Sequence, residues 1–447
     1  MKHLEAPTKL RDKSSPMRKV NTYMKHTTKR GMQVAAFAAA GALALGGLTA
    51  CSGGGSDTFT VWWYEKDTAM ATTWKAALDA LAKAHPNVKI NFQLKTWDQM
   101  QKSGAAVLDS DKAPDLTEYN KGNATAGVVA KAGLLVDLKD YSAKYGWDKI
   151  LPESALAFGK YDENGIMGQG NLYGIASYGE YVSWFYNKDM FDANGWAIPT
   201  TQDELTALLG QMKAAGKTQC IGGKDYQNVH LAYALTLSGA DKQWLANFQA
   251  FAGEVDWSKW GFAATTMSDW LAKGYFPKNV AGISADNAVA EFQAGKTCPM
   301  IMGGTWLDQG MQDAIKFNWD KFKNPGNMSE GSAGNLLVIP TNSKNKDLAA
   351  EFINMILTKD YQNQLGELGG LPLAADTASL KNPLAVKTNK VFADILATGD
   401  GLGWYPDWPV AGYFDIQLAA GQKLLSDGNA DAYVATVSDF YNKNKGQ

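Results

Sequence analysis

The sequence predicts an α/β protein that folds into two lobes. Three observations support this prediction. A strand–helix–strand pattern begins at residue 59, and strands and amphipathic helices alternate again in the middle of the chain. The 397 residues that follow residue 50 are enough for two domains with well-filled cores, and no repeat of fixed period divides them.

The first strand–helix–strand unit can be followed residue by residue. Residues 59–64 form a short apolar run, as expected of a parallel strand that is covered on both faces. Asp67 or Thr68 can cap the next helix, which ends before Pro86 because proline excludes the preceding residue from the helical region. Across residues 88–94 apolar and polar side chains alternate, which predicts a half-buried strand. The apolar face of the helix consists of Trp74, Leu78 and Leu81.

The middle of the chain repeats this alternation. Residues 173–176 and 184–187 are predicted to be extended, and a helix then begins at Thr201, which stands at capping-box spacing from Glu204. The apolar stripe of this helix is Leu205, Leu208, Leu209 and Met212, with Gly216 suited to its C-terminal cap. Further helices are predicted over residues 346–357 and 410–441.

Residues 1–50 are predicted to be a removable signal peptide. A basic segment precedes an apolar stretch at 31–47, which is too short and too rich in alanine and glycine to span a membrane. The Leu-Thr-Ala-Cys that follows resembles a bacterial lipobox, so Cys51 is expected to be acylated, with residues 51–57 as a Gly/Ser tether. An ordinary secretory signal is the alternative, and translation could start at Met17 or Met24.

The mature chain is acidic and is expected outside the cell, on the extracellular face of the cytoplasmic membrane or in a periplasm. The leader holds nine Lys/Arg and two acidic residues, which leaves 34 basic and 43 acidic residues, a net charge of −9. This excess disfavours nucleic acid as a partner, because binding to nucleic acid depends on surplus Lys and Arg.

Two cysteines remain after Cys51. In an oxidising compartment Cys220 and Cys298 can form a disulfide, and two buried free thiols are the alternative. These cysteines and the two histidines of the mature chain, His85 and His230, do not have the spacing of a zinc site.

Six segments, in this order and across nearly the whole mature chain, carry a family resemblance. They are residues 59–63, 113–116, 132–138, 172–205 in part, 292–306 in part, and 349–373 in part. Together they resemble the extracellular solute-binding proteins of ABC importers, in the branch that serves carbohydrates. The resemblance implies a two-lobe, periplasmic-binding-protein-like α/β fold of type II, with a hinge that the chain crosses more than once.

The same resemblance implies domain boundaries and partners. Residues 58–176 and 331–374 would form the N-terminal lobe, and residues 177–330 and 375–447 the C-terminal lobe. The lobes would close on a carbohydrate, with an oligosaccharide favoured, and the loaded protein would dock as a monomer on the permease subunits of an ABC transporter. The lipid anchor on Cys51 would hold it at the membrane. No catalytic residue, metal ion or cofactor is expected.

The sequence lacks the common catalytic motifs. Gly-Lys-Thr occurs at 216–218 and 295–297, but Gln211 and Ala290 stand where a phosphate-binding loop needs its first glycine. Neither a Gly-x-Ser-x-Gly elbow nor a His-Glu-x-x-His segment occurs. Residues 162–165 begin like a calcium loop but lack its later ligands, which favours a turn between strands.

Aromatic residues at predicted strand ends and loops are the candidate ligand contacts. The chain has 15 Trp and 18 Tyr, whose rings can cover the apolar face of a sugar while Asp, Glu, Asn and Lys bind its hydroxyls. Loops that follow strand ends form the cleft in such folds. The candidate contacts are Tyr64, Glu65, Tyr119, Asn120, Tyr178, Glu180, Trp306, Trp404, Tyr405 and Trp408. Packing inside the protein is the alternative for each, and it is the prediction for Trp244, Trp257, Trp260 and Trp270.

Two other classes of function fit the same sequence. A secreted lipoprotein enzyme that cleaves carbohydrates would also gather aromatic rings around a sugar, and a buried pair of carboxylates at the cleft floor would favour it. The same receptor fold could instead bind a polyamine, a peptide or a metal chelate. An acidic cleft with few aromatic rings would favour a polyamine.

Overall fold

The computed structural model describes residues 57–446 apart from 66–67, 377, 379 and 398. The predicted signal peptide, the lipobox cysteine Cys51 and all but the last residue of the tether lie outside the described residues. Within the described part of the chain, no helix is both long and apolar enough to cross a membrane.

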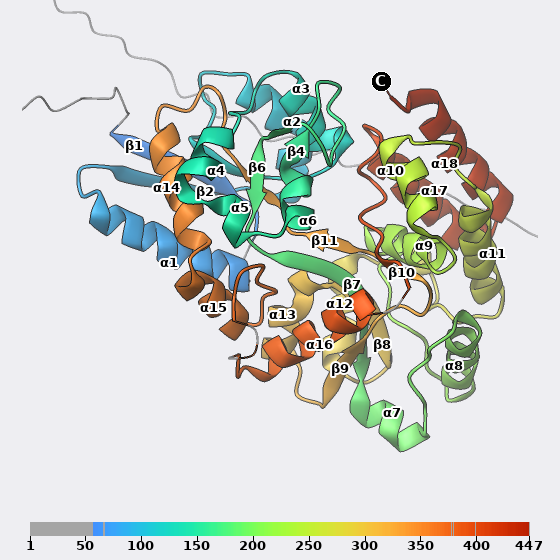
Figure 1. Ribbon diagram of the computed structural model, residues 1–447. Helices are drawn as coiled ribbons and strands as arrows, with labels where there is room; N and C mark the ends of the chain where they lie inside the picture. Colours follow the sequence, from blue (N-terminus) through green and yellow to red (C-terminus); the bar gives the residue numbers. More distant parts are fainter. Residues whose placement is uncertain (1–56, 66–67, 377, 379, 398, 447) are drawn as a thin grey trace, which may run out of the picture. The chain divides into compact units, whose positions relative to one another are not determined.

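The first of two main sheets has five strands in the order β2-β1-β3-β12-β6 (Figure 1). Strands β1, β2 and β3 run parallel, which confirms the predicted strand–helix–strand unit, and β12 is antiparallel to both of its neighbours. The strands are β1 (Thr58–Trp63), β2 (Lys89–Leu94), β3 (Leu116–Tyr119), β6 (Gly174–Ala176) and β12 (Leu336–Val338).

Helix α1 (Ala69–Ala84) covers this sheet as its apolar stripe predicts. The hydroxyl of Thr68 caps it by accepting a hydrogen bond from the amide of Ala71. Trp74, Leu78 and Leu81 are all buried in one core with residues of β1 and of α14 (Lys346–Ile356). Figure 1 shows α1, α14 and α15 (Lys359–Glu367) side by side. The predicted helix at 346–357 is thus confirmed.

Strand β2 departs from its predicted burial. Its alternating apolar residues should face a core, yet Phe92 is 41% and Leu94 46% exposed. The reason is position, because β2 is the edge strand of the sheet. Phe92 still contacts Trp63 of the neighbouring strand, with ring centroids 4.0 Å apart.

Asp115 gives the Ala-Pro-Asp-Leu segment a structural role. Its buried carboxylate accepts hydrogen bonds from the amide of Thr60 at 2.8 Å and from the amides of Lys344 and Asn345 at 3.0 and 3.1 Å. The hydroxyl of Ser343 donates a further bond at 3.0 Å. The Asp115 side chain therefore joins β1 and the residues just before α14 to β3, which begins at the next residue.

The second sheet is built around β7 (Gly179–Asn187), all of whose residues are buried. Strands β11, β8 and β9 all pair with β7 in antiparallel fashion. Their bounds are β8 (Met300–Gly304), β9 (Trp319–Phe322) and β11 (Gly331–Ala333). The extended segments predicted at 173–176 and 184–187 correspond to β6 and to the end of β7.

The chain passes between the two sheets at two adjacent places. Residues 177–178 connect β6 to β7, and residues 334–335 connect β11 back to β12. At Gly334 a Cβ atom would stand 2.3 Å from the ring of Tyr178, so only glycine lets these two crossings lie so close. The chain crosses a third time between α15, which packs with α1 beside the first sheet, and α16 (Pro383–Ala397), which contacts β9 of the second sheet.

Most helices of the C-terminal half gather beside the second sheet. Helix α8 (Gln202–Ala214) begins with the predicted capping box, in which Thr201 and Glu204 each bind the other's backbone. Helices α9 (Gln227–Leu237), α11 (Ser258–Ala272), α17 (Tyr413–Asp427) and α18 (Ala430–Asn444) contact one another (Figure 1). The helical segment predicted at 410–441 is thus two helices, separated where Gly428 adopts a left-handed conformation (φ 71°).

The tryptophans predicted to be packing residues lie in this helical group. Trp244, Trp260 and Trp270 are at most 4% exposed, and Trp257 packs partly buried against the same core.

The remaining helices are α2 (Trp97–Leu108), α3 (Val128–Lys131), α4 (Lys139–Tyr145), α5 (Trp147–Ile150), α6 (Glu153–Leu156), α7 (Lys188–Asn194), α10 (Lys242–Ala250), α12 (Ala285–Ala294) and α13 (Asp308–Ala314). Two short strand pairs join β4 (Lys160–Tyr161) to β5 (Asn171–Leu172) and β10 (Met328–Ser329) to β13 (Gly401–Leu402).

The segment at 162–165 is the predicted turn, since it follows β4 and turns back toward β5. The Asp162 carboxylate accepts hydrogen bonds from the amides of Asn164 and Ile166, and Gly165 has φ 78°. The Asp162 carboxylate therefore binds backbone amides within the turn.

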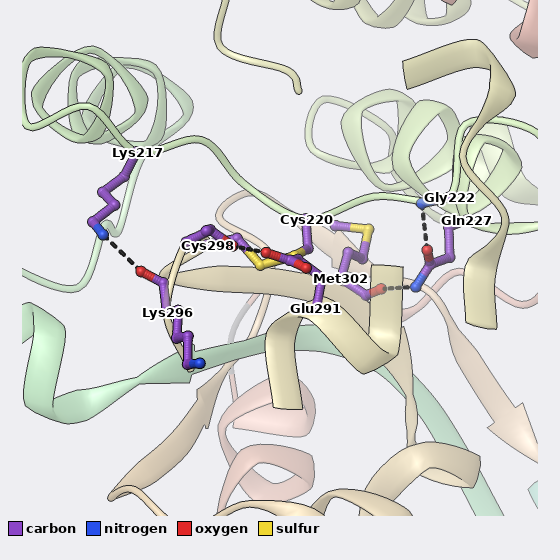
Figure 2. The surroundings of a disulfide bond; sticks show 9 residues. Lys217, Cys220, Gly222, Gln227, Glu291, Lys296, Cys298 and Met302 are labelled. Atoms are coloured by element: carbon purple, nitrogen blue, oxygen red, sulfur yellow. Dashed lines mark hydrogen bonds between the residues drawn. A yellow bond between two sulfur atoms is a disulfide. The ribbon is translucent and has the colours of Figure 1, made fainter. Parts of the chain in front are cut away.

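Cys220 and Cys298 are joined in a disulfide, with a Cα–Cα distance of 5.5 Å (Figure 2). The bond ties the segment after α8 to the residues just before β8, and Cys220 also forms a parallel bridge with Ile301. The two Gly-Lys-Thr segments meet here, because the ammonium of Lys217 donates to the carbonyl of Lys296 at 2.7 Å. Figure 2 shows this hydrogen bond near the disulfide.

Candidate ligand-binding cavity

A cavity of about 480 Å³ lies between the first sheet and the helices beside the second. This volume falls within the range of about 300–1,000 Å³ typical of small-molecule sites. Seven of the predicted contact residues line it: Tyr64, Glu65, Asn120, Glu180, Trp306, Tyr405 and Trp408. A second hollow of about 490 Å³, between α8 and α11, contains none of the predicted contacts.

The first wall is the edge where the parallel strands end. Tyr64 and Glu65 directly follow β1, and Asn120 directly follows β3. The buried carboxylate of Glu118 holds the first pair in place by accepting hydrogen bonds from the amides of Tyr64 (2.8 Å) and Glu65 (3.3 Å). The carboxyl ends of parallel strands meet at one edge of a sheet, which is why residues far apart in the sequence converge here.

A buried ion pair joins this wall to β7. The ammonium of Lys121, whose side chain has no exposed surface, donates to Glu180 at 3.0 Å and to the side-chain oxygen of Asn335 at 3.3 Å. Asn335 in turn donates to Glu118 at 3.1 Å. The same ammonium lies 5.1 Å from the ring centre of Trp408. Both inter-sheet crossings are thus connected to the cavity through Glu180, Lys121 and Asn335.

Trp306 forms the opposite wall from the short turn (Thr305–Leu307) that follows β8. Its ring folds back over Gly304, where a Cβ atom would stand 2.1 Å from it, so the glycine in Gly-Gly-Thr-Trp makes room for the ring. His230 and Tyr226 lie beside it, with ring centroids 5.5 and 6.2 Å away.

The loop at 404–408 supplies the third wall. The rings of Tyr405 and Trp408 lie 5.2 Å apart, and the side-chain amide of Gln249 donates to the carbonyl of Tyr405 at 2.7 Å. Among the described residues the buried hydroxyl of Tyr405 has no hydrogen-bond partner. Trp408 also packs against Gly122, where a Cβ atom would clash with it.

Three predicted contacts do not line the cavity. Tyr119 is 6% exposed because its ring packs against Gly104 of α2. Tyr178 is 1% exposed, and its hydroxyl accepts hydrogen bonds from Asn335 instead of facing the cavity. Trp404 has φ 57°, and its ring lies against Phe158 at 5.6 Å. Of these residues, Tyr178 acts on the site indirectly by holding Asn335.

Several lining residues were not among the predicted contacts. They are Trp97, Asp225, Tyr226, His230, Ala285, Asp286, Asn335, Asp407, Phe414 and Leu418. Trp97 could have been found, because it begins the helix after β2 and its ring meets Tyr64 edge-on at 5.4 Å. The residues at the start of α9, α12 and α17 carry no local signal, since they reach the cavity only through helix packing.

Burial raises the pKa of four acidic groups in the cavity or directly behind it. Burial, with repulsion from Glu180, raises the pKa of Glu65 to about 7. Burial likewise raises the pKa of Asp407 to about 6 and that of Glu330 to about 7, and it raises the pKa of Glu118. For His230 burial disfavours the imidazolium, but attraction and a 2.7 Å hydrogen bond to Glu330 outweigh this and raise its pKa.

These shifts predict that the ligand-free protein loses stability as the pH rises from 5 to 8. Each group has a higher pKa in the folded than in the unfolded chain, so the folded state holds its proton more tightly. That contribution is complete below the unfolded pKa values and disappears as the pH passes through about 6 to 7. Urea unfolding at four pH values measures this, and a free energy of unfolding that stays constant or rises would contradict it. The double variant Glu65→Gln/Asp407→Asn should show a shallower slope.

The fold and the cavity together define a class of protein: a two-lobe, type II periplasmic-binding-protein fold with an aromatic and acidic site between its sheets. The sequence profile of the bacterial extracellular solute-binding proteins matches residues 64–363. The chain therefore belongs to this family, and the predicted fold class is confirmed.

The individual relatives match this chain at low sequence identity. The chain is 29% identical over 289 residues to a probable sugar-binding periplasmic protein of Rhizobium meliloti, an alignment that spans 58% of this chain and 65% of that relative. It is 25% identical over 382 residues to the diacetylchitobiose binding protein DasA of Streptomyces coelicolor, over 79% and 81% of the two chains. A solved chitin oligosaccharide binding protein superposes with a TM-score of 0.74 at 20% identity, over 87% of this chain and 98% of that one.

These relatives are named as binding proteins, not as enzymes. The described residues contain no group of three or more His, Cys, Asp or Glu side chains that could hold a metal ion.

Proposed function

We propose that this protein is a receptor that captures a carbohydrate and delivers it to an ABC importer. The observation that carries the proposal is the set of half-buried rings around one cavity, with Trp306 on one wall and Tyr64 and Trp97 on the opposite one. Rings on separate walls can each cover an apolar sugar face, while Glu65, Asn120 and other polar groups bind hydroxyls. The sugar-binding relatives support the same function.

The finer parts of the proposal concern capture and delivery. An oligosaccharide suits several rings spread over different walls better than a single sugar does. The lobes, 58–176 with 331–374 and 177–330 with 375–447, would close on it about the paired crossings, so that ligand shifts the population toward the closed form. The loaded monomer would then dock on the permease. Acylated Cys51 would keep the protein at the outer face of the membrane.

Replacing Trp306 by alanine tests the site. We expect calorimetric titration with a panel of mono- and oligosaccharides to identify a ligand, and Trp306→Ala to weaken its binding about thirtyfold or more, as for a buried aromatic anchor worth about 2 kcal/mol. The partly exposed Trp257 packs against Tyr441 and is not among the residues that line the cavity, so Trp257→Ala is the matched control. It should lower stability but leave binding unchanged. Equal binding by Trp306→Ala and wild type would remove Trp306 from the site.

A carbohydrate-cleaving enzyme is the second candidate, because buried carboxylates do surround the cavity. Glu118 and Glu180, however, already accept hydrogen bonds from Tyr64, Asn335 and Lys121. The same titration mixtures, analysed for shortened sugars, distinguish the two functions. Binding without cleavage supports the receptor, cleavage would establish the enzyme, and no binding to any sugar would contradict the proposal.

A further inference from the structure

The cavity is rich in acidic groups and poor in basic ones. Five acidic side chains line it, on Glu65, Glu180, Asp225, Asp286 and Asp407, and among the described lining residues His230 is the only one that can become cationic. Glu118 and Glu330 add two buried carboxylates directly behind it. Hydroxyl recognition alone does not require so many acidic groups, because neutral amide oxygens also accept hydrogen bonds from hydroxyls.

Among the described residues, the cationic groups at the site are Lys121 and His230, and both are already paired. The ammonium of Lys121 is buried in its contacts with Glu180 and Asn335. The Nδ1 atom of His230 is paired with Glu330. Glu65 remains under repulsion from Glu180, and Glu330 under repulsion from Asp407 and Glu180. Since burial and mutual repulsion favour the protonated carboxyls, a neutral ligand that closes the cavity would leave them poorly ionised, whereas a bound cation would favour their charged forms.

Buried polar groups without hydrogen-bond partners also lie at the cavity. Among the described residues, the buried hydroxyls of Tyr64 and Tyr405 have no hydrogen-bond partner, and both residues line the cavity. The Asp407 carboxylate accepts a long hydrogen bond of 3.4 Å from the side-chain amide of Asn120. Buried polar groups are seldom left without partners, so a ligand with several donors would complete this site.

We propose that the preferred ligand is a saccharide that carries a protonated amine, held against Glu65 and Asp407 while one of its rings stacks on the half-buried Trp306. This inference rests on the proposed carbohydrate-receptor function. The aromatic walls distinguish it from a simple polyamine, which has no ring to stack. The excess of carboxylates distinguishes it from a neutral or N-acetylated sugar, whose nitrogen carries no charge.

Three disaccharides with one linkage test the proposal by calorimetry at pH 7: cellobiose, N,N′-diacetylchitobiose and chitobiose with free amines. They differ at the second carbon of each ring, which bears hydroxyl, acetamide or amine. We expect chitobiose to bind at least about tenfold more tightly than the other two, as an added charge-assisted hydrogen bond would produce. Raising the salt concentration should reduce this advantage but not the affinity for cellobiose.

The variant Glu65→Gln locates the amine, because glutamine keeps a hydrogen-bonding side chain of similar shape without the charge. The ratio of the cellobiose to the chitobiose dissociation constant should fall about tenfold. Glu163→Gln, an equal change of charge on the exposed turn after β4, should leave the ratio as in wild type. Asp407→Asn provides a second measurement if the first variant does not fold.

The outcomes separate the two proposals. Cellobiose or diacetylchitobiose binding as tightly as chitobiose would overturn the amine preference and leave the carbohydrate receptor standing. Spermidine binding more tightly than any sugar would overturn both in favour of a polyamine. If Glu65→Gln weakens all three sugars equally, Glu65 is an ordinary hydroxyl acceptor and the inferred position of the amine is wrong.

Discussion

Replacing Lys321 by methionine is expected to lower the free energy of unfolding by about 3–5 kcal/mol, the usual effect of removing one partner of a buried ion pair. The Lys321 ammonium on β9 lies 2.7 and 2.9 Å from the carboxylate of Asp308 and 3.1 Å from the hydroxyl of Thr388. The side chains of the pair are 0% and 3% exposed. Without Lys321, the Asp308 carboxylate must remain buried and unpaired or take up a proton.

Urea unfolding followed by tryptophan fluorescence measures this loss, and a double variant shows its origin. Lys321→Met/Asp308→Leu removes both charges and should recover much of the stability, because the uncompensated carboxylate is gone. Lys188 and Asp192 form an ion pair of 2.6 Å on the surface, so Lys188→Met is the matched control and should cost at most about 1 kcal/mol. A similar cost for Lys188→Met and Lys321→Met would show that burial is not the cause.

Removing the disulfide should be nearly as costly. Cys220 and Cys298 are 78 residues apart, and closing a loop of that size reduces the entropy of the unfolded chain enough to stabilise the protein by about 4 kcal/mol. We therefore expect the double variant Cys220→Ala/Cys298→Ala to unfold at clearly lower urea concentration than the oxidised protein.

Reduction provides the control for this prediction. All samples should carry Cys51→Ser, so that Cys220 and Cys298 are the only thiols. Dithiothreitol should then destabilise the protein with the intact pair toward the level of the double variant, and it should not affect the double variant. If dithiothreitol leaves the unfolding curve of the intact protein unchanged, the bond does not form or does not stabilise the fold.

Much of the fold could be predicted because its signals are local. The Thr68 cap, the capping box of Thr201 and Glu204, and the apolar stripe of α1 each depend on residues within a few positions of one another. The exposure of Phe92 could not be predicted, because alternation specifies one face of a strand but not whether that strand lies at a sheet edge.

The part of the cavity wall that is formed by residues at strand ends could be predicted from the sequence. Tyr64, Glu65 and Asn120 stand at the ends of β1 and β3, where a sheet of this type places its ligands. Tyr119 and Tyr178 are one or two positions from lining residues but face the interior, a distinction that sequence position does not reveal. Asp225, Tyr226 and His230 approach Trp306 only through the packing of α9, so nothing near them in the sequence marks them.

The loop that carries Tyr405 and Trp408 has a consequence for biosynthesis. A chain that has emerged only as far as residue 400 already contains every strand of both main sheets, yet it lacks one wall of the cavity. Ligand stabilises whatever state binds it by mass action, so it can protect only the completed molecule and not this intermediate. Resistance to proteolysis that depends on ligand would therefore report that residues 401–447 have docked.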